Sequence, residues 1–162
     1  MSIESVARAA GTTVPSLRRR YRDKAALAGA VIDSMRVAPL AGGDGSPRKR
    51  ALAVLENFRR NLARPHSMAL LGTLLAEEDR HPELIGRFRD RLVKERRALL
   101  AEALQAGLEA GELAADTDLD AAVSMLIGSF YAIYVSRGRV PKDWPDRVLS
   151  GVWPSIRYDS NS

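Results

Sequence analysis

Three consecutive arginines near the start of the chain are the side chains best suited to binding a nucleic acid. Arg18, Arg19 and Arg20 are followed by Lys24, and residues 1–24 hold six of the 25 basic side chains but two of the 20 acidic ones. Guanidinium groups form paired hydrogen bonds with phosphates and guanine edges. Most of the net charge of +5 therefore lies in this segment, which is typical of a nucleic-acid binder. A solvated Arg-rich helix face is the alternative when charge alone is considered.

Two short helices joined by a tight turn are expected to position these arginines. Apolar residues at three-and-four spacing predict a helix over residues 3–10, and Gly11 suits its left-handed exit. Thr13 can cap a second helix that has Pro15 in its first turn, where a missing N–H costs nothing. Such a pair is a helix-turn-helix, whose second helix enters the DNA major groove.

The apolar and glycine positions of this segment follow one spaced pattern. Its residues are Ile3, Val6, Ala7, Ala10, Gly11, Leu17, Tyr21, Lys24 and Leu27. The pattern resembles the DNA-binding signature of the tetracycline-repressor (TetR) family of bacterial transcriptional regulators. The family has a tyrosine where this chain has Arg18, so a phosphate contact from tyrosine would become one from arginine. The family also places another helix before the signature, and the chain begins one residue before it. Either the chain lacks that first helix, its start is misassigned, or the DNA-binding head is incomplete.

The resemblance implies that the second helix contacts both bases and phosphates of a double-stranded DNA operator. The expected DNA-binding residues are Thr13, Val14, Pro15, Ser16, Arg18, Arg19, Arg20, Tyr21 and Lys24. Consecutive helical residues lie roughly 100° apart, so the three arginines cannot all face the bases. Base edges are expected for Val14, Pro15 and either Arg19 or Arg20, and phosphates for Thr13, Ser16, Arg18 and Lys24. Leu17 should be core, and the Tyr21 hydroxyl should reach the DNA backbone.

Helical periodicity continues along the chain and predicts an all-α fold. Further helices are expected to begin at Asp23, at Ser46 and Pro47 after a Pro- and Gly-rich link, and after Ser67. A helix of about 25 residues should begin at Pro82. The last two helices are expected from Leu119 to Val135 and from Trp144 to Ser155. We therefore expect a helix-turn-helix head with its connecting helix over residues 1–36. A helical effector-binding and dimerisation domain should occupy residues 46–158.

An acidic cluster that ends in His81 could in principle bind a metal ion. Glu77, Glu78 and Asp79 precede it, but no Glu-x-x-His or His-x-x-x-His pair lies within a helix, and the chain has 2 His and no Cys. A cap or surface position explains His81 better. The run from Glu77 to Leu84 also resembles a stretch common in ligand-binding domains of the TetR family. The sequence predicts no metal, no cofactor and no enzyme, since nucleophile–base pairs and phosphate loops are missing as well.

The helix expected after Leu119 is the most apolar part of the chain and has two apolar faces. The second face carries small residues and one methionine at spacings of four, three and four. A helix that is apolar nearly all round must bury both sides, so a homodimer is expected; ordinary core packing is the alternative. The residues expected at the dimer interface are Ala121, Met125, Gly128, Ala132, Val148 and Val152.

Aromatic and long apolar side chains of the body could line an effector pocket, although core packing is the better explanation for each of them. They are Phe58, Leu71, Leu75, Phe88, Met125, Phe130, Tyr131 and Tyr134. By resemblance, a small molecule bound there would favour a dimer whose heads no longer match the operator. The expected function is a ligand-responsive repressor that binds a palindromic operator as a dimer. The alternative is a helical dimer that binds a ligand or protein partner without DNA, because its head is incomplete.

The chain has no signal-peptide pattern at its start and no window of about 18 uncharged apolar residues. We therefore expect a cytoplasmic, bacterial protein without a membrane partner.

Overall fold

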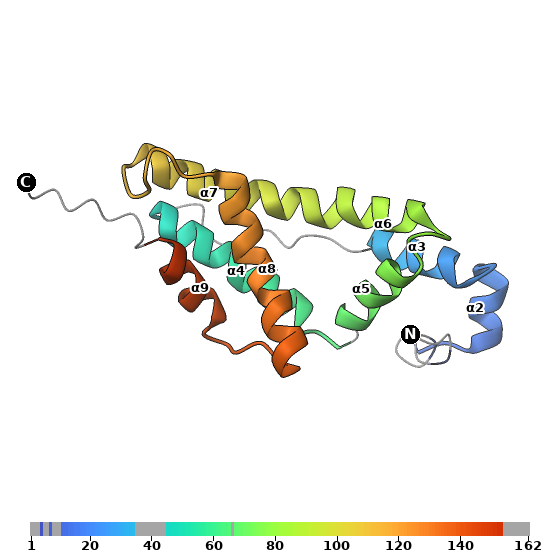
Figure 1. Cartoon of the computed structure of the whole chain (residues 1–162). Helices are drawn as coiled ribbons and strands as arrows, with labels where there is room; N and C mark the ends of the chain where they lie inside the picture. Colours follow the sequence, from blue (N-terminus) through green and yellow to red (C-terminus); the bar gives the residue numbers. More distant parts are fainter. Residues whose placement is uncertain (1–3, 5–6, 8–10, 35–44, 66, 154–162) are drawn as a thin grey trace, which may run out of the picture. The chain divides into compact units, whose positions relative to one another are not determined.

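The computed structural model describes residues 4, 7, 11–34, 45–65 and 67–153, and all regular structure in these ranges is helical (Figure 1). The predicted all-α fold is thus confirmed. The chain divides into two compact units. Unit 1 consists of Met1–Val37 and Arg64–Glu95, and unit 2 consists of Ala38–Ala63 and Arg96–Ser162.

Unit 1 contains α2 (Val14–Arg20), α3 (Lys24–Ser34), α5 (Ser67–Ala76), α6 (Pro82–Phe88) and η1 (Arg89–Val93). The expected start of α2 is confirmed, because the Thr13 hydroxyl oxygen accepts the Ser16 N–H at 3.3 Å. Gly11 has φ of 59°, a left-handed conformation in which glycine avoids the strain of a Cβ. Of the helix expected over residues 3–10, only Glu4 and Ala7 are described, and both are helical.

Two apolar clusters hold unit 1 together. The larger one joins α3, α5 and α6 and consists of Ala28, Ile32, Leu70, Leu74, Leu84 and Ile85. The smaller one consists of Ala7, Leu17 and Leu27, with Val14 and Tyr21 packed against it. Leu17 is therefore a core residue, as predicted, and its packing in this cluster holds α2 in place.

A π-helical segment, η1, interrupts the long helix expected after Pro82. It follows α6 directly and continues into α7 (Lys94–Glu109). A π turn adds one residue to a helical turn and so offsets the positions that follow. Regular periodicity predicts Leu99 on the apolar face, whereas the structure buries Arg96, Leu100 and Leu104 completely or nearly so.

Unit 2 contains α4 (Pro47–Leu62), α8 (Leu119–Arg137) and α9 (Trp144–Val152), together with α7 from Arg96 onward (Figure 1). Ser46 and Asp118 cap α4 and α8 by accepting the N–H groups of Lys49 at 3.4 Å and of Ala121 at 2.9 Å. The cap at Ser46 agrees with the sequence prediction. The fully buried side chains at the centre of the unit include Leu55, Leu100, Leu104, Leu126, Phe130, Trp144 and Leu149.

Gly107 lies on α7 against the indole of Trp153, and this contact leads to a stability prediction. A Cβ at Gly107 would lie 2.8 Å from Cη2 and 2.9 Å from Cζ2 of Trp153, whose Nε1 donates to Glu112 at 3.2 Å. Because the ring is held, we expect Gly107→Ala to lower the free energy of unfolding by about 1–3 kcal/mol, despite the better helix propensity of alanine. Urea denaturation at one fixed protein concentration measures the change.

The matched control is Gly72→Ala in α5, where an added Cβ would meet nothing within 4 Å. This substitution should raise the free energy of unfolding by roughly 0.5–1 kcal/mol, because it only restricts the unfolded chain and improves helix propensity. Equal effects of the two substitutions would contradict the contact between Gly107 and Trp153.

Candidate functional site

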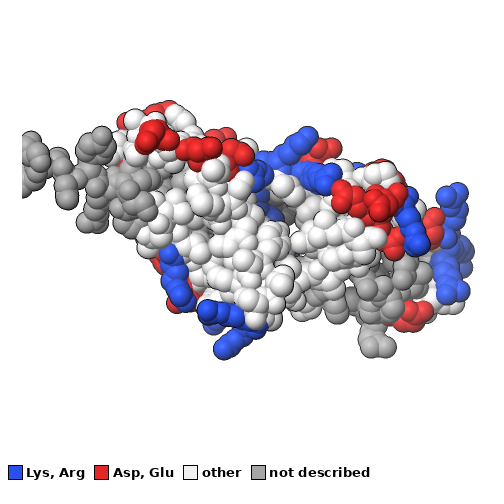
Figure 2. Space-filling model, in the orientation of Figure 1, with Lys and Arg blue, Asp and Glu red and all other residues white. Residues whose placement is uncertain are grey.

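Helix α2 presents its basic side chains to solvent. Arg18, Arg19 and Arg20 are all exposed, whereas Leu17 of the same helix is 8% exposed. Figure 2 shows the basic side chains gathered over this helix. Helix α2 is thus held by a buried leucine and carries three exposed arginines. This arrangement can present cations to a polyanion such as DNA.

A hollow of about 550 Å³ lies beside the arginines of α2. Its lining consists of Thr12, Ser16, Leu17, Arg19, Arg20 and Tyr21. The Arg20 guanidinium also lies over the Tyr21 ring, 5.8 Å from its centroid, which restrains both side chains. Of the residues expected to contact DNA, Ser16, Arg19, Arg20 and Tyr21 therefore share one concave surface.

The remaining residues expected to contact DNA have different surroundings. Thr13 and Pro15 are exposed at the start of α2, and Thr13 also donates its hydroxyl to Ser16 Oγ at 3.0 Å. Val14 is half-buried and packs against the small apolar cluster. Lys24 is the first residue of α3.

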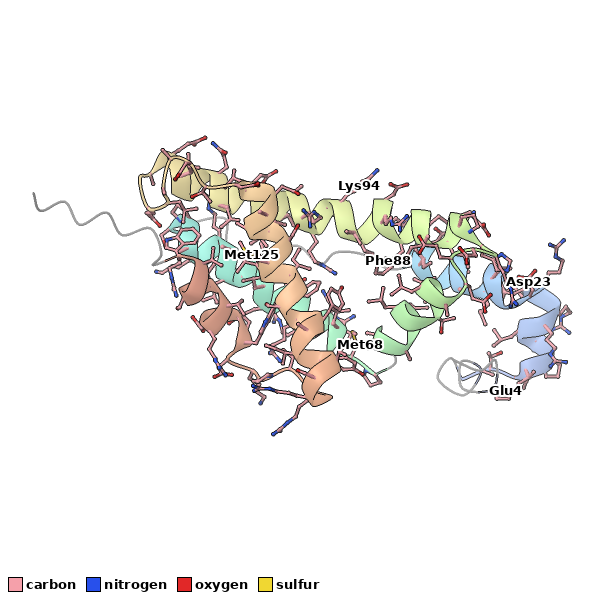
Figure 3. The ribbon with its side chains drawn as sticks, viewed as in Figure 1. Glu4, Asp23, Met68, Phe88, Lys94 and Met125 are labelled. Atoms are coloured by element: carbon pink, nitrogen blue, oxygen red, sulfur yellow. The ribbon has the colours of Figure 1, made fainter. Side chains whose placement is uncertain are left out.

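Asp23 lies at the junction between α2 and α3 (Figure 3) and caps α3. Its carboxylate accepts the Ala26 N–H at 2.8 Å, and this hydrogen bond is the main cause of a lowered pKa for Asp23. Arg22 adds an exposed ion pair at 3.5 Å. The carboxylate therefore stays charged in its cap, and the basic surface of α2 ends here.

Asp33 joins the end of α3 to α6 and η1 through ion pairs with two arginines. The Asp33 carboxylate pairs with Arg87 at 3.4 Å and with Arg91 Nε at 3.5 Å. Arg91 Nη1 also donates to the main-chain carbonyl of Asp33 at 3.0 Å. The partners are partly exposed, so each pair stabilises only weakly, but together they fix the end of α3 on α6 and η1.

Acidic side chains near His81, considered above as possible metal ligands, take part in ion pairs. Glu77 pairs with Arg80 at 3.8 Å, and Glu78 with Arg89 at 2.7 Å. His81 stands at the N-cap of α6 and its Nδ1 lies 3.3 Å from Glu83 Oε1. Within the described part of the chain, no group of three His, Asp or Glu residues could hold a metal ion.

The structure brings three of the residues expected in an effector pocket together inside unit 2. Phe58 lies 5.2 Å from Phe130 and 6.0 Å from Tyr131 between ring centroids, both edge to face. Trp144 completes this aromatic cluster at 5.3 Å from Phe130, and its Nε1 donates to Ser129 Oγ at 3.0 Å. We call Phe58, Phe130, Tyr131 and Trp144 the aromatic cluster.

The other residues expected in the pocket do not belong to this cluster. Leu71, Leu75 and Phe88 are in unit 1, where Leu75 is 53% exposed and Phe88 packs against the larger apolar cluster. Met125 is 61% exposed on α8 (Figure 3). Tyr134 is half-buried.

Arg96 is a member of this region that the sequence analysis missed. It is 8% exposed, and its guanidinium carbon lies 5.3 Å from the centroid of the Phe58 ring. The available signal was the spacing of four that places Arg96 between Leu92 and Leu100. Spacing alone does not reveal its burial, because arginine usually lies on the solvent side of a helix.

Burial raises the pKa of the Tyr131 hydroxyl, and the nearby positive charge of Arg96 opposes this effect. The phenol therefore remains protonated at neutral pH and can donate a hydrogen bond. Unit 2 thus holds a buried cation and a phenolic donor that each lie near the Phe58 ring.

The second apolar face of α8 is exposed in a single subunit. Ala121, Met125, Gly128 and Ala132 are all exposed, and Val135 on the same helix is 83% exposed. By length and composition alone, Leu119–Arg137 could cross a membrane, and 22% of its apolar window is buried within the subunit. Val148 and Val152 of α9 are half-buried.

Comparison with known proteins identifies the domain that contains α4 to α9. A sequence model described as "Tetracyclin repressor-like, C-terminal domain" matches residues 43–152, which is more than half of the chain. No curated protein matches the chain. The matched region begins beyond α2 and α3, so it is independent of the residues that resemble the DNA-binding signature. This chain belongs to the tetracycline-repressor (TetR) family.

Proposed function

We propose that this protein is a cytoplasmic, bacterial DNA-binding regulator without enzymatic activity, and that it acts as a ligand-responsive repressor. The observation that carries the proposal is the exposed row of Arg18, Arg19 and Arg20 on a helix capped by Thr13 and anchored by Leu17. Cations on one rigid helix suit both phosphate neutralisation and recognition of guanine edges. The family match, which covers the body of the chain, supports a regulator on independent evidence.

A homodimer would place two such helices in successive major grooves of a palindromic operator. The exposed apolar face of α8 supports this assembly, because a partner helix would remove it from water. Gly128 adds a second argument. A Cβ there would meet nothing within 4 Å in one subunit, so the cost of a glycine inside a helix is unexplained until another helix approaches closely.

Operator binding with Arg19→Ala tests the proposal. Arg19 is exposed and borders the hollow on α2, so its loss should weaken binding about tenfold or more, as expected for a guanidinium that contacts a base or phosphate. Fluorescence anisotropy on DNA from the promoter region of the gene, at two salt concentrations, measures both affinity and its salt dependence.

The control is Arg139→Ala, which removes an exposed arginine of unit 2 and should leave operator affinity unchanged. If the folded wild-type dimer does not bind DNA at low salt, the regulator proposal fails. The protein would then be a helical dimer that binds a ligand or protein partner without DNA.

A further inference from the structure

The three arginines of α2 differ in their positions around the helix. Successive residues of an α-helix are rotated by about 100°, so each position relative to the buried Leu17 follows from its number. Arg19 lies roughly 160° from Leu17, on the face opposite the packed side. Arg18 lies roughly 100° from Leu17 on one flank, and Arg20 roughly 60° from it on the other flank. Of the three arginines, Arg19 is the one placed opposite the buried side chain.

Arg20 is restrained on its flank by Tyr21. The Arg20 guanidinium lies over the Tyr21 ring, 5.8 Å from the ring centroid. The ring is itself held in place, since it packs against the small apolar cluster that contains Leu17. A guanidinium stacked on an aromatic face in this way is less free to extend outward. Arg20 is therefore directed along the side of α2, toward Tyr21.

The flank that carries Arg20 also borders the hollow beside α2, and it has the donors that a phosphate needs. Thr12, Ser16 and Arg20 recur at a spacing of four and all line the hollow. Ser16 Oγ accepts the hydroxyl of Thr13 at 3.0 Å, so its own O–H can donate to another acceptor. A guanidinium and a hydroxyl on one concave surface match the oxygens of a phosphate group.

A DNA duplex presents its phosphates and its bases at different depths. The phosphates protrude along the rims of the major groove, whereas the base edges lie at its floor, about 8.5 Å deep. A concave flank therefore suits a phosphate, and the outermost face of a helix suits a base edge. Arg19 borders the hollow as well, but its position opposite Leu17 lets its long side chain extend toward the floor of the groove.

We propose that Arg19 is the arginine of α2 that reads a base, by donating two hydrogen bonds to O6 and N7 of a guanine, and that Arg20 holds a backbone phosphate in the hollow. This inference rests on the proposed DNA-binding function and adds the residue that determines its sequence specificity. A palindromic operator then carries one such guanine in each half-site.

The first test compares specific with non-specific binding by the full-length protein. The specific probe is a duplex that the wild type selects from a random-sequence pool, and the non-specific probe is the same duplex with its sequence scrambled. Arg19→Lys keeps the charge but loses the planar fork, so the ratio of the two affinities should fall about tenfold or more. Arg20→Lys is the matched control and should leave this ratio within about twofold of the wild-type value.

Removal of charge tests the phosphate contact. Arg20→Ala should weaken binding to both probes by the same factor, because a phosphate carries no sequence information. It should also lower the slope of log K against log salt by about one for each bound subunit. A ratio that falls with Arg20→Ala as far as with Arg19→Lys would overturn the division of roles between the two arginines.

Modified guanines locate the base contact. Replacing one guanine of the selected duplex at a time by 7-deazaguanine removes the N7 acceptor and keeps the base pair. At one position in each half-site, this replacement should weaken binding by the wild type about three- to tenfold. The same replacement should have no further effect on Arg19→Ala, which already lacks the contact.

The outcomes separate this inference from the function on which it rests. A preference for the selected duplex that persists in Arg19→Lys overturns the base-reading assignment and leaves the regulator proposal standing. The same holds if the effect of 7-deazaguanine persists in Arg19→Ala. If the folded wild type binds DNA at low salt but selects no sequence, no base is read and the assignment fails. Absence of any DNA binding overturns the proposed function and the assignment with it.

Discussion

Phe130→Ala should lower the free energy of unfolding by about 3–5 kcal/mol, the usual cost of removing a buried aromatic ring. Phe130 is 2% exposed, and it contacts three other rings at centroid distances between 5.2 and 5.7 Å. Its loss leaves a cavity between α4, α8 and α9 and also removes the edge-to-face contacts. Urea denaturation followed by circular dichroism measures the change at one protein concentration.

The control for Phe130→Ala is Glu102→Ala, an exposed position on α7. Its effect should stay within about 0.5 kcal/mol, as for most surface substitutions. If Phe130→Ala costs no more than Glu102→Ala, then the aromatic cluster does not form the centre of unit 2.

Met125→Glu should convert the proposed dimer into monomers at micromolar concentration. Met125 is 61% exposed on the apolar face of α8, between the exposed small residues Ala121 and Gly128. A carboxylate buried there without a partner costs several kcal/mol, which corresponds to an increase of about a hundredfold or more in the dimer Kd. Analytical ultracentrifugation measures the change, and circular dichroism should show the same helix content.

Operator affinity should fall together with dimer stability, because two recognition helices per operator require two subunits. The matched control is Ala110→Glu, which adds the same charge at an exposed position after α7. That variant should remain dimeric. If Met125→Glu sediments as the wild type does, the subunits associate through another surface, and the exposed face of α8 needs a different partner.

Local chemistry explains why the starts of the helices could be predicted from sequence. Thr13 and Ser46 each cap a helix as expected, because a side-chain oxygen reaches an N–H only two or three residues ahead. Glycines 11, 111 and 138 have positive φ at helix exits, which is likewise a property of single residues. These features need no knowledge of the rest of the molecule.

The exposed stripe on α8 was predictable for a related reason. Its residues recur at helical spacing, and the helix has more apolar surface than one subunit buries. The three arginines of α2 were identified by type and order alone, and Leu17 by its spacing of four from Tyr21. Periodicity within one helix determines which side chains share a face, and therefore which of them can act together.

Contacts between distant segments depended on the tertiary structure. The expected pocket residues look alike in sequence, yet Phe58, Phe130 and Tyr131 meet in unit 2 while Leu75 and Phe88 belong to unit 1. Gly107, which periodicity treats as a weak point near the end of a helix, is the place where the Trp153 ring packs. Such pairings follow from how helices far apart in the chain are packed.

Arg96 illustrates the difference between what the sequence predicts and what only the tertiary structure decides. By sequence it is one more cation in a charged stretch of helix, and arginine is a residue type that is seldom buried. In the structure Arg96 lies in the buried row of Leu92, Leu100 and Leu104. Composition and spacing alone determined the all-α class, the caps and the basic helix. Only tertiary packing decided which cation is buried, because burial depends on the neighbouring helices as well as on the residue itself.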